Sequence, residues 1–313
     1  MSALICGSFA FDTIMVFQDY FKNHILPDKV HILNVAFHVP DLRREFGGCA
    51  PNIAYNLKLL RGNPLPMGTV GKDFSSYAEW MDQHGIPRNH VKKIDCSYTA
   101  QAFITTDQDD NQITAFHPGA MDYAHEVKVG DAQGVKIGIV SPDGRQGMID
   151  HAQQFAEAGI PFIFDPGQAM PLFTADDFKL FIEQASWVCV NDYESQLLQD
   201  RTGWSPHEIA ERVTALIVTR GGEGSYIYMS GKRIEIPAAK ANAIVDPTGC
   251  GDAYRAGLLY GLMNGFDWEV TGRIAALMGA IKIEHHGTQN HNFTLDEFRD
   301  RYSDSFAMKL EAI

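Results

Sequence analysis

The sequence Ala243-Ile-Val-Asp-Pro-Thr-Gly-Cys-Gly-Asp252 contains the turn from which the rest of the chain can be interpreted. Its β-branched residues predict a short strand that ends at Asp246, because a proline follows. The run Gly249-Cys250-Gly251 then permits a sharp change of direction. From Ala253 to Met263, apolar residues recur at the spacing of one helix face. This stretch therefore predicts a strand, a tight turn and a helix.

A turn of this kind creates a site for an anion. The first backbone N–H groups of a helix have no partner within the helix, and the helix dipole places positive potential beside them. Gly249, Cys250 and Gly251 are therefore predicted to bind phosphate oxygens through their amides. Asp252 either caps the helix or acts as a general base, since a carboxylate beside a bound anion is unfavourable unless it accepts a proton. The free amides of the turn and the adjacent carboxylate together favour a phosphate site with a general base.

Composition limits the classes of function. With 313 residues, 45% of them apolar, the chain can bury a large core. The formal charge of −13 argues against nucleic acids and acidic membranes as partners, because both require clustered basic residues. The five cysteines include no C-x-x-C pair, which indicates neither a disulfide framework nor a zinc site. No leader sequence and no apolar run of about 18 residues is found. We therefore expect a soluble, cytoplasmic protein.

Two segments of the N-terminal half carry further candidates. An apolar strand at the start of the chain leads to Asp12, which is either an exposed turn residue or a carboxylate that binds a ligand. Gly47 and Gly48 precede a predicted helix, and Asn52 lies at the beginning of that helix. The glycine pair either permits unusual φ angles in a loop or lets a ligand approach the backbone closely.

The two glycine-containing segments together resemble the signatures of the ribokinase-like, or pfkB, family of carbohydrate and nucleoside kinases. Asp246-Pro-Thr-Gly-Cys-Gly-Asp252 is similar to the C-terminal signature, and Gly47-Gly48 with Asn52 is similar to the N-terminal one. Cys250 stands where the family more often has alanine, a difference that a turn lined by backbone amides tolerates. The resemblance covers nearly the whole chain and is closest to the adenosine and nucleoside kinases.

This resemblance implies roles for individual residues. The turn of Gly249, Cys250 and Gly251 would stabilise the transferring phosphoryl group, and Asp252 would deprotonate the accepting hydroxyl. The residues implied to bind the hydroxyls of the acceptor are Asp12, Gly47, Gly48 and Asn52. The site would thus combine residues from both ends of the chain.

The nucleotide and its cations are assigned by the same resemblance. ATP binding is implied for Asn191, Thr219, Gly221 and Gly224. Glu194 would hold Mg²⁺ through water, and Asp246 with nearby carbonyls would bind a monovalent cation such as K⁺. The spacing of Asn191 and Glu194 also fits a helix capping box, and Arg220 either neutralises phosphate or faces solvent.

The order of predicted elements indicates the fold. From Val135 onward strands and helices alternate, which predicts a mostly parallel sheet with ligands at the carboxyl ends of its strands. Residues 13–46, with alternating apolar residues at 35–39, and a hairpin at 98–116 predict a small β-sheet. With the resemblance, this implies a three-layer α/β/α ribokinase-like domain of residues 1–11, 47–96 and 119–313, covered by a β lid of residues 12–46 and 97–118.

The lid hairpin also indicates the substrate class. It resembles the lid hairpin of nucleoside kinases, and Cys49 stands where ribokinases proper usually have lysine. Phe103 and Phe116 either pack near a purine or form the core of the hairpin. The predicted reaction is ATP-dependent phosphorylation of a nucleoside hydroxymethyl group, with adenosine converted to AMP in purine salvage. The alternative is a sugar kinase of the same family that acts on ribose, fructose or a related sugar.

Other functions fit less well. A dinucleotide dehydrogenase requires G-x-G-x-x-G after the first strand, and the sequence from Gly7 lacks it. An inactive relative is disfavoured because Asp252 and the glycines of its turn are present. Three histidines, His285, His286 and His291, are expected to be solvated loop residues and not a metal site. Residues 293–313 predict a charged amphipathic helix, and the protein is expected to be a monomer or a homodimer that pairs through the lid.

Overall fold

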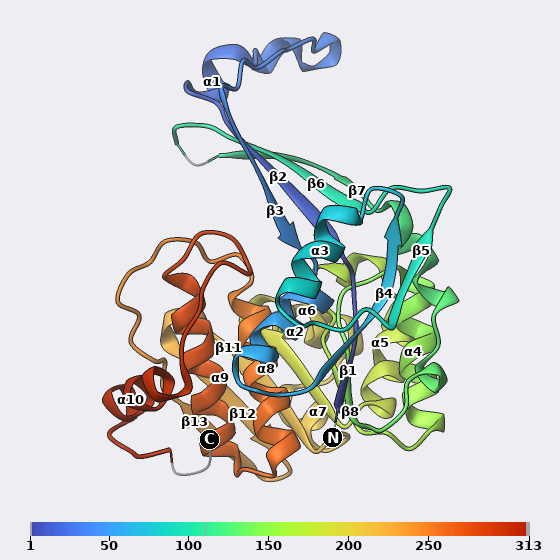
Figure 1. Ribbon diagram of the computed structural model, residues 1–313, viewed down its shortest axis with the longest axis vertical. Helices are drawn as coiled ribbons and strands as arrows, with labels where there is room; N and C mark the ends of the chain where they lie inside the picture. The colour runs from blue at the N-terminus through green and yellow to red at the C-terminus, as the bar shows by residue number, and fades with distance from the viewer. Residues whose placement is uncertain (1, 110, 311–313) are drawn as a thin grey trace.

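The computed structural model describes residues 2–109 and 111–310. Asp110 of the predicted lid turn and residues 311–313 of the predicted C-terminal helix lie outside that part. Figure 1 shows a body of helices around a large sheet, from which a smaller sheet projects. Among the described residues, no helix combines the length and the apolar character needed to cross a membrane.

Nine strands of the described chain form the large sheet. The neighbours from β11 to β5 all pair in parallel, and β12 pairs antiparallel with both β11 and β13. In spatial order the strands are β13 (Lys232–Ile236), β12 (Ser225–Met229), β11 (Ala215–Thr219), β10 (Trp187–Asn191), β9 (Phe162–Phe164), β8 (Val135–Val140), β1 (Ser2–Cys6), β4 (Pro64–Gly71) and β5 (His90–Ile94).

Helices cover both faces of this sheet. Along β10, Val188 and Val190 face one hydrophobic core and Cys189 faces the other, because successive side chains of a strand point to opposite faces. The first layer consists of α2 (Cys49–Leu59), α3 (Ser75–Gln83), α8 (Cys250–Asn264), α9 (Trp268–Ile283) and α10 (Leu295–Phe306). The second layer consists of α4 (Arg145–Glu157), α5 (Ala175–Gln184), α6 (Asp192–Thr202) and α7 (Pro206–Ala210). The predicted three-layer α/β/α fold is confirmed.

The small sheet, called the lid here, consists of β3 (Asp41–Gly47), β2 (Ala10–Val16), β6 (Ala100–Thr106) and β7 (Gln112–His117) in spatial order. The β6–β7 pair is the predicted hairpin. Asp12 lies opposite both Glu45 and Ala102, and Ala102 lies opposite Phe116, so these four side chains share one face of the lid. The opposite face carries the exposed apolar side chains of Leu42, Phe103 and Ile113.

The strand predicted around Val35, Phe37 and Val39 is wrong. Between β2 and β3 the chain forms the short helix α1 (Phe21–His24), the 3₁₀ helix η1 (Pro27–Ile32) and a segment without strand pairing. The alternation of burial is present, since all three residues are partly buried between exposed neighbours. The Phe37 ring packs on those of Phe17 and Phe21, with centroids 4.9 and 5.0 Å away. The alternation therefore reflects contact with an aromatic cluster and not pairing in a sheet.

The strand predicted at Ala243–Asp246 is also wrong. The amides of Val245 and Asp246 both donate to the carbonyl of Ile283, at 2.8 and 3.1 Å. Ile283 is the last residue of α9, where carbonyl groups lack partners within the helix. The segment satisfies this helix end instead of joining a sheet, and Ile244 is 83% exposed as a result.

Further 3₁₀ helices in the described chain connect the remaining elements: η2 (Gly119–Glu126), η3 (Val129–Asp131), η4 (Gly167–Leu172) and η5 (Gly221–Glu223).

Candidate active site

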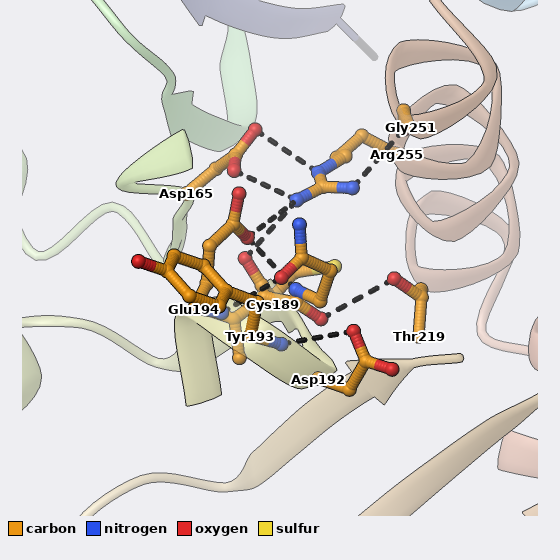
Figure 2. Close-up of polar contacts among 10 residues, drawn as sticks. Asp165, Cys189, Asp192, Tyr193, Glu194, Thr219, Gly251 and Arg255 are labelled. Carbon is orange, nitrogen blue, oxygen red and sulfur yellow. Dashed lines mark hydrogen bonds and ion pairs between the residues drawn. The ribbon is translucent and has the colours of Figure 1, made fainter. Parts of the chain in front are cut away.

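The candidate residues gather at the carboxyl edge of the large sheet. Asp165 follows β9, Asn191 ends β10 and Thr219 ends β11, so three neighbouring parallel strands end at the same place. Figure 2 shows that these strand ends face the first turns of α8, from which Arg255 reaches across to Asp165. Segments far apart in the sequence therefore form one site.

The turn before α8 leaves backbone amides unpaired. Gly249 has a φ angle of 77°, in the left-handed region that favours glycine. The amide of Cys250 donates to the carbonyl of Pro247 at 3.1 Å. In the described part of the chain, the amides of Gly249, Gly251 and Asp252 donate no hydrogen bond. We call these three amides the amide cradle. The sequence predicted that the amide of Cys250 would belong to this group, and in the structure the amide of Asp252 takes its place.

Asp252 lies beside this cradle and is held by Asn52. Asn52 Nδ2 donates to Asp252 Oδ2 at 2.8 Å, which joins the first turn of α2 to that of α8. Burial raises the pKa of Asp252 to about 7, and the charges of Asp165 and Asp12 add to this effect. The hydrogen bond from Asn52 and the charge of Arg255 oppose it. A carboxyl group with this pKa can exchange a proton near neutral pH.

Gln289, which no sequence motif identified, orients the side chain of Asn52. Gln289 Nε2 donates to Asn52 Oδ1 at 2.8 Å and to the Tyr77 hydroxyl at 2.7 Å. The Tyr77 hydroxyl in turn donates to the carbonyl of Gly47 at 2.8 Å. Because the oxygen of the Asn52 amide is occupied in this way, its NH₂ group faces Asp252.

Gly47 and Gly48 allow the lid strand to approach this site. A Cβ atom on Gly47 would lie 2.5 Å from Asp12 Oδ2, and Gly48 has a φ angle of 92°. The Asp12 carboxylate is partly exposed and accepts no hydrogen bond from the residues described. Burial, with the charges of Glu45 and Asp246, raises the pKa of Asp12 to about 6. The Asp12 carboxylate is therefore available to accept hydrogen bonds from a bound hydroxyl.

Asn191 and Glu194 form the capping box that their spacing allowed. Asn191 Oδ1 accepts from the Glu194 amide at 2.7 Å, and Glu194 Oε2 accepts from the Asn191 amide at 2.8 Å. Burial raises the pKa of Glu194, while the charge of Arg255 lowers it. Within the described chain, the second carboxylate oxygen of Glu194 has no hydrogen-bond partner. The capping role therefore leaves one oxygen that can bind a hydrated cation.

Arg255 is a further residue of the site that no motif identified. Its Nε and Nη2 atoms donate to the two carboxylate oxygens of Asp165 at 3.0 and 2.9 Å, and Nη2 lies 3.9 Å from Glu194 Oε2. The side chains of Arg255 and Asp165 are 7% and 4% exposed. Figure 2 shows the guanidinium between α8 and the strand ends. The available signal was a single charge within an apolar helix segment, and Asp165, a strand-end aspartate, proves to be its partner.

The loop after β11 has the glycine conformations of a tight turn. Gly221 and Gly224 have φ angles of 53° and 86°. Thr219 Oγ1 donates to the carbonyl of Val190 at 3.4 Å, which ties this loop to β10. Arg220 does not extend into solvent, because its guanidinium pairs with Glu223 at 2.9 Å and is mostly buried.

Asp246 closes the loop that leads to the amide cradle. Its two carboxylate oxygens accept from the amides of Thr248 and Gly287, both at 2.9 Å. Its carbonyl oxygen accepts from Lys282 Nζ at 2.8 Å, and the same ammonium donates to the carbonyl of His285 at 3.0 Å. Lys282 is fully buried. An ammonium group is thus already bound to the carbonyl oxygen of Asp246, the residue that was predicted to bind a monovalent cation.

Comparison with known proteins decides the family. Residues 13–294 match the pfkB family of carbohydrate kinases. This chain belongs to the pfkB family. A solved structure of a nucleoside kinase from Burkholderia thailandensis in complex with inosine is 51% identical in sequence, with 98% of this chain and 99% of that chain covered and a TM-score of 0.90. A structure of the same kinase in complex with ADP-inosine has a TM-score of 0.87 at 51% identity, with coverage of 99% of both chains.

More distant relatives of this pfkB protein are also kinases. The nucleoside kinase of Methanocaldococcus jannaschii is 32% identical over 86% of this chain and 89% of its own length. Its crystal structure covers 97% of this chain and 99% of that chain with a TM-score of 0.88. The family predicted from two short motifs is confirmed, and with it the activity of a kinase.

The lid phenylalanines of this pfkB kinase do not form a core. Phe116 and Phe103 are 51% and 40% exposed, so the interpretation that they fill the hairpin interior is wrong. Phe116 shares a face of the lid with Asp12, whereas Phe103 lies on the opposite face. Of the two, Phe116 is the one on the face of the lid that carries Asp12.

The expectation of solvated histidines is wrong for His291. This residue is fully buried, and its Nε2 atom lies 2.7 Å from Asn56 Oδ1 because the loop after α9 packs against α2. Burial lowers the pKa of His291 to about 3, so its ring is neutral. His286 is exposed and His285 is partly exposed. The described residues contain no cluster of three or more histidine, cysteine or acidic side chains able to bind a metal.

Proposed function

We propose that this pfkB kinase transfers the γ-phosphoryl group of ATP to the 5′-hydroxyl of a purine nucleoside. The observation that carries the proposal is the position of Asp252, a carboxyl group with a pKa of about 7, beside three unpaired amides. The 51% identity to a nucleoside kinase whose structure was solved in complex with inosine supports a nucleoside as the acceptor. Adenosine is the substrate predicted from the sequence, and inosine is the ligand of that similar kinase.

The acceptor hydroxyl is activated by Asp252. Asp12, Gly47 and Asn52 hold the ribose hydroxyls, so that the 5′-oxygen lies between the carboxylate of Asp252 and the γ-phosphorus. The 5′-oxygen forms a bond to phosphorus, the bond from phosphorus to the β,γ-bridging oxygen breaks, and Asp252 accepts the hydroxyl proton. The amide cradle stabilises negative charge on the transferring group, as aligned backbone donors do in other sites.

ATP lies along the carboxyl edge of the large sheet in this proposal. The residues that would contact it are Asn191, Thr219, Gly221 and Gly224. The free oxygen of Glu194 would hold Mg²⁺ through a water molecule, and when bound the ion neutralises phosphate charge. Burial of Glu194 beside Arg255 keeps this carboxylate in a fixed position.

The lid supplies the remaining wall of the site. Its face with Asp12 and Phe116 would cover the nucleoside, with the Phe116 ring against the base. Closure of the lid excludes water, which competes with the 5′-hydroxyl as phosphoryl acceptor. Closure of the lid over the nucleoside would thus also protect ATP from hydrolysis.

The setting of the reaction follows from the same observations. All five cysteines are free, which supports a reducing cytoplasm. A reaction that converts a nucleoside to its monophosphate belongs to purine salvage.

For assembly we retain two alternatives, a monomer or a homodimer that pairs through the lid. The exposed apolar residues on the outer lid face, Leu42, Phe103 and Ile113, favour the dimer.

A substrate panel tests the proposal. With Mg²⁺-ATP, we expect turnover of adenosine or inosine and little turnover of ribose or fructose, measured as ADP release. 5′-Deoxyadenosine is a matched control, since it keeps the base and the ribose hydroxyls but lacks the accepting group; it should inhibit without being phosphorylated. Turnover of the sugars but of no nucleoside would establish the alternative sugar kinase and refute the proposal.

The pH dependence is expected to follow Asp252. Its pKa of about 7 means that the carboxylate form needed to accept a proton is lost as pH falls through 7. The pKa of Asp12, about 6, adds a second loss at lower pH. We therefore expect kcat/KM for the nucleoside to be half-maximal near pH 7 and to fall more steeply below pH 6. Initial rates between about pH 5 and pH 9 measure this, and a profile that stays flat to pH 5 contradicts the assignment.

A further inference from the structure

Lys282 is a fully buried lysine beside the turn that carries the amide cradle. It lies in the last turn of α9, where the helix dipole favours a positive charge. A buried ammonium group is unfavourable unless oxygen atoms replace its water shell. The carbonyl oxygens of Asp246 and His285, at 2.8 and 3.0 Å from Nζ, serve this purpose.

Asp246 connects this ammonium to the amide cradle. The cradle turn begins directly after it, and its carboxylate accepts from the amide of Thr248 within that turn. The other carboxylate oxygen accepts from the amide of Gly287, in the loop that follows α9. The next residue of that loop, Thr288, lies under Gly249, where a Cβ atom would approach its side chain to 3.0 Å. Lys282 therefore holds together the two loops that support the cradle.

The oxygen atoms around Lys282 are of the kind that bind a monovalent cation. The resemblance to other pfkB kinases places such an ion at Asp246 and nearby carbonyls. In this chain, however, the carbonyl of Asp246 is already bound by the ammonium of Lys282. A second cation on the same oxygen would be repelled at short range, and the protein interior screens that repulsion weakly. The residues around Asp246 therefore do not fit a K⁺ ion.

We propose that the ammonium group of Lys282 takes the place of a monovalent cation in this kinase and holds the amide cradle in its working geometry. The charge is attached to α9 and is present at every salt composition. Lys282 touches no reacting atom, so it is a positioning residue. The activity measurements described below rest on the proposed function. The melting temperatures, which report the binding of an ion, do not.

The first test uses the unmodified protein. Activity with Mg²⁺-ATP and nucleoside is measured in chloride salts of K⁺, Na⁺ and tetramethylammonium at equal ionic strength. We expect kcat/KM to change by less than about two-fold, because no cation has to enter the site. The melting temperature, which rises when an ion binds the folded state, is expected to be the same in all three salts. Activation by K⁺ of about ten-fold or more, or a melting temperature raised by K⁺ alone, would overturn the proposal.

The second test removes the ammonium in two ways. Lys282→Ala leaves a cavity next to the two carbonyls, whereas Lys282→Met fills most of the same space without a charge. We expect both variants to lose up to about 10²-fold in kcat, since small displacements of positioned groups have effects of this size. K⁺ or ethylammonium should restore activity to Lys282→Ala and raise its melting temperature, and should do neither for Lys282→Met.

A matched control is Lys240→Ala, which removes an exposed lysine from the loop before the cradle turn. This variant should keep its activity and show no response to K⁺. Equal activity of Lys282→Ala and the unmodified protein would overturn the proposal, as would a loss that neither cation reverses in activity or melting temperature. If no nucleoside is phosphorylated at all, the melting temperatures still decide the question for Lys282 and only the proposed function fails.

Discussion

Replacement of Asp252 by asparagine is expected to lower kcat by about 10²–10⁴-fold, the usual contribution of a positioned general base. The asparagine side chain has nearly the same shape and can still accept the hydrogen bond that Asn52 donates, so the site should keep its geometry. The change removes only the ability to accept the 5′-hydroxyl proton. Steady-state kinetics measure the loss, and calorimetric binding of the nucleoside, expected to stay within a few-fold of the unmodified protein, shows that the site is intact.

Stability provides an independent readout for the same variant. The pKa of Asp252 in the folded protein, about 7, lies above the ordinary value of 3.8. Stability associated with the protonated carboxyl is therefore present below pH 4 and is lost as pH rises through 7. Asparagine cannot ionise, so Asp252→Asn should melt at an equal or higher temperature than the unmodified protein at pH 8.

The control for Asp252 is Asp176→Asn, which removes an exposed carboxylate from the first turn of α5. It changes the charge at a helix start in the same way but lies away from the cradle, so kcat should not change. An Asp252→Asn variant that keeps more than about a tenth of the activity would show that another group accepts the proton.

Replacement of Arg255 by methionine is expected to destabilise the protein by about 3–5 kcal/mol, because removal of one partner leaves the other charge buried and unpaired. The partner is Asp165, whose side chain is only 4% exposed and which accepts two hydrogen bonds from the guanidinium. Glu194 loses the same nearby cation, which lies 3.9 Å away. Denaturant unfolding measures the change as a difference in the free energy of unfolding.

Two further variants separate the effect of the unpaired charge from the effect of burial. In the double variant Arg255→Met with Asp165→Asn, the unpaired charge of Asp165 is absent and only that of Glu194 remains, so much of the lost stability should return. Arg88→Met breaks a pair with Asp82 of the same bidentate geometry, at 2.8 Å for both bonds, but this pair is exposed, so the loss of stability should be much smaller than for Arg255→Met. Equal effects of Arg255→Met and Arg88→Met would show that burial of the Arg255 pair has no special consequence.

The fold was largely predictable because its signals are local. The alternation of apolar strands with helical segments after Val135 indicated a parallel sheet between helices, and the lid hairpin was apparent from two strand-like runs around a polar turn. Two predicted strands were wrong for a shared reason. The runs at residues 35–39 and 243–246 have strand-like composition, but in the described structure neither run pairs with a strand. Composition cannot reveal whether a hydrogen-bonding partner is present.

The candidate site was predictable only in part. Asp252, its glycine turn, and the pair Gly47 and Gly48 were apparent because their spacing is fixed by backbone conformation within a few residues. Arg255 and Lys282 were not identified, although each is a cation among mostly buried residues of its helix. Such a residue signals a buried partner, but nothing in the neighbouring sequence says which residue that partner is.

The order of residues was therefore sufficient to predict the pfkB family, the three-layer sheet architecture and the turn that presents the amide cradle, because glycine conformation, helix periodicity and motif spacing are properties of short segments. The contacts between Asn52 and Asp252, Asp165 and Arg255, and Asp246 and Lys282 were decided by the tertiary structure alone. Each contact joins residues from different segments of the chain. Their distance depends on how the sheet and helices pack, and so does the burial that shifts the pKa of Asp252.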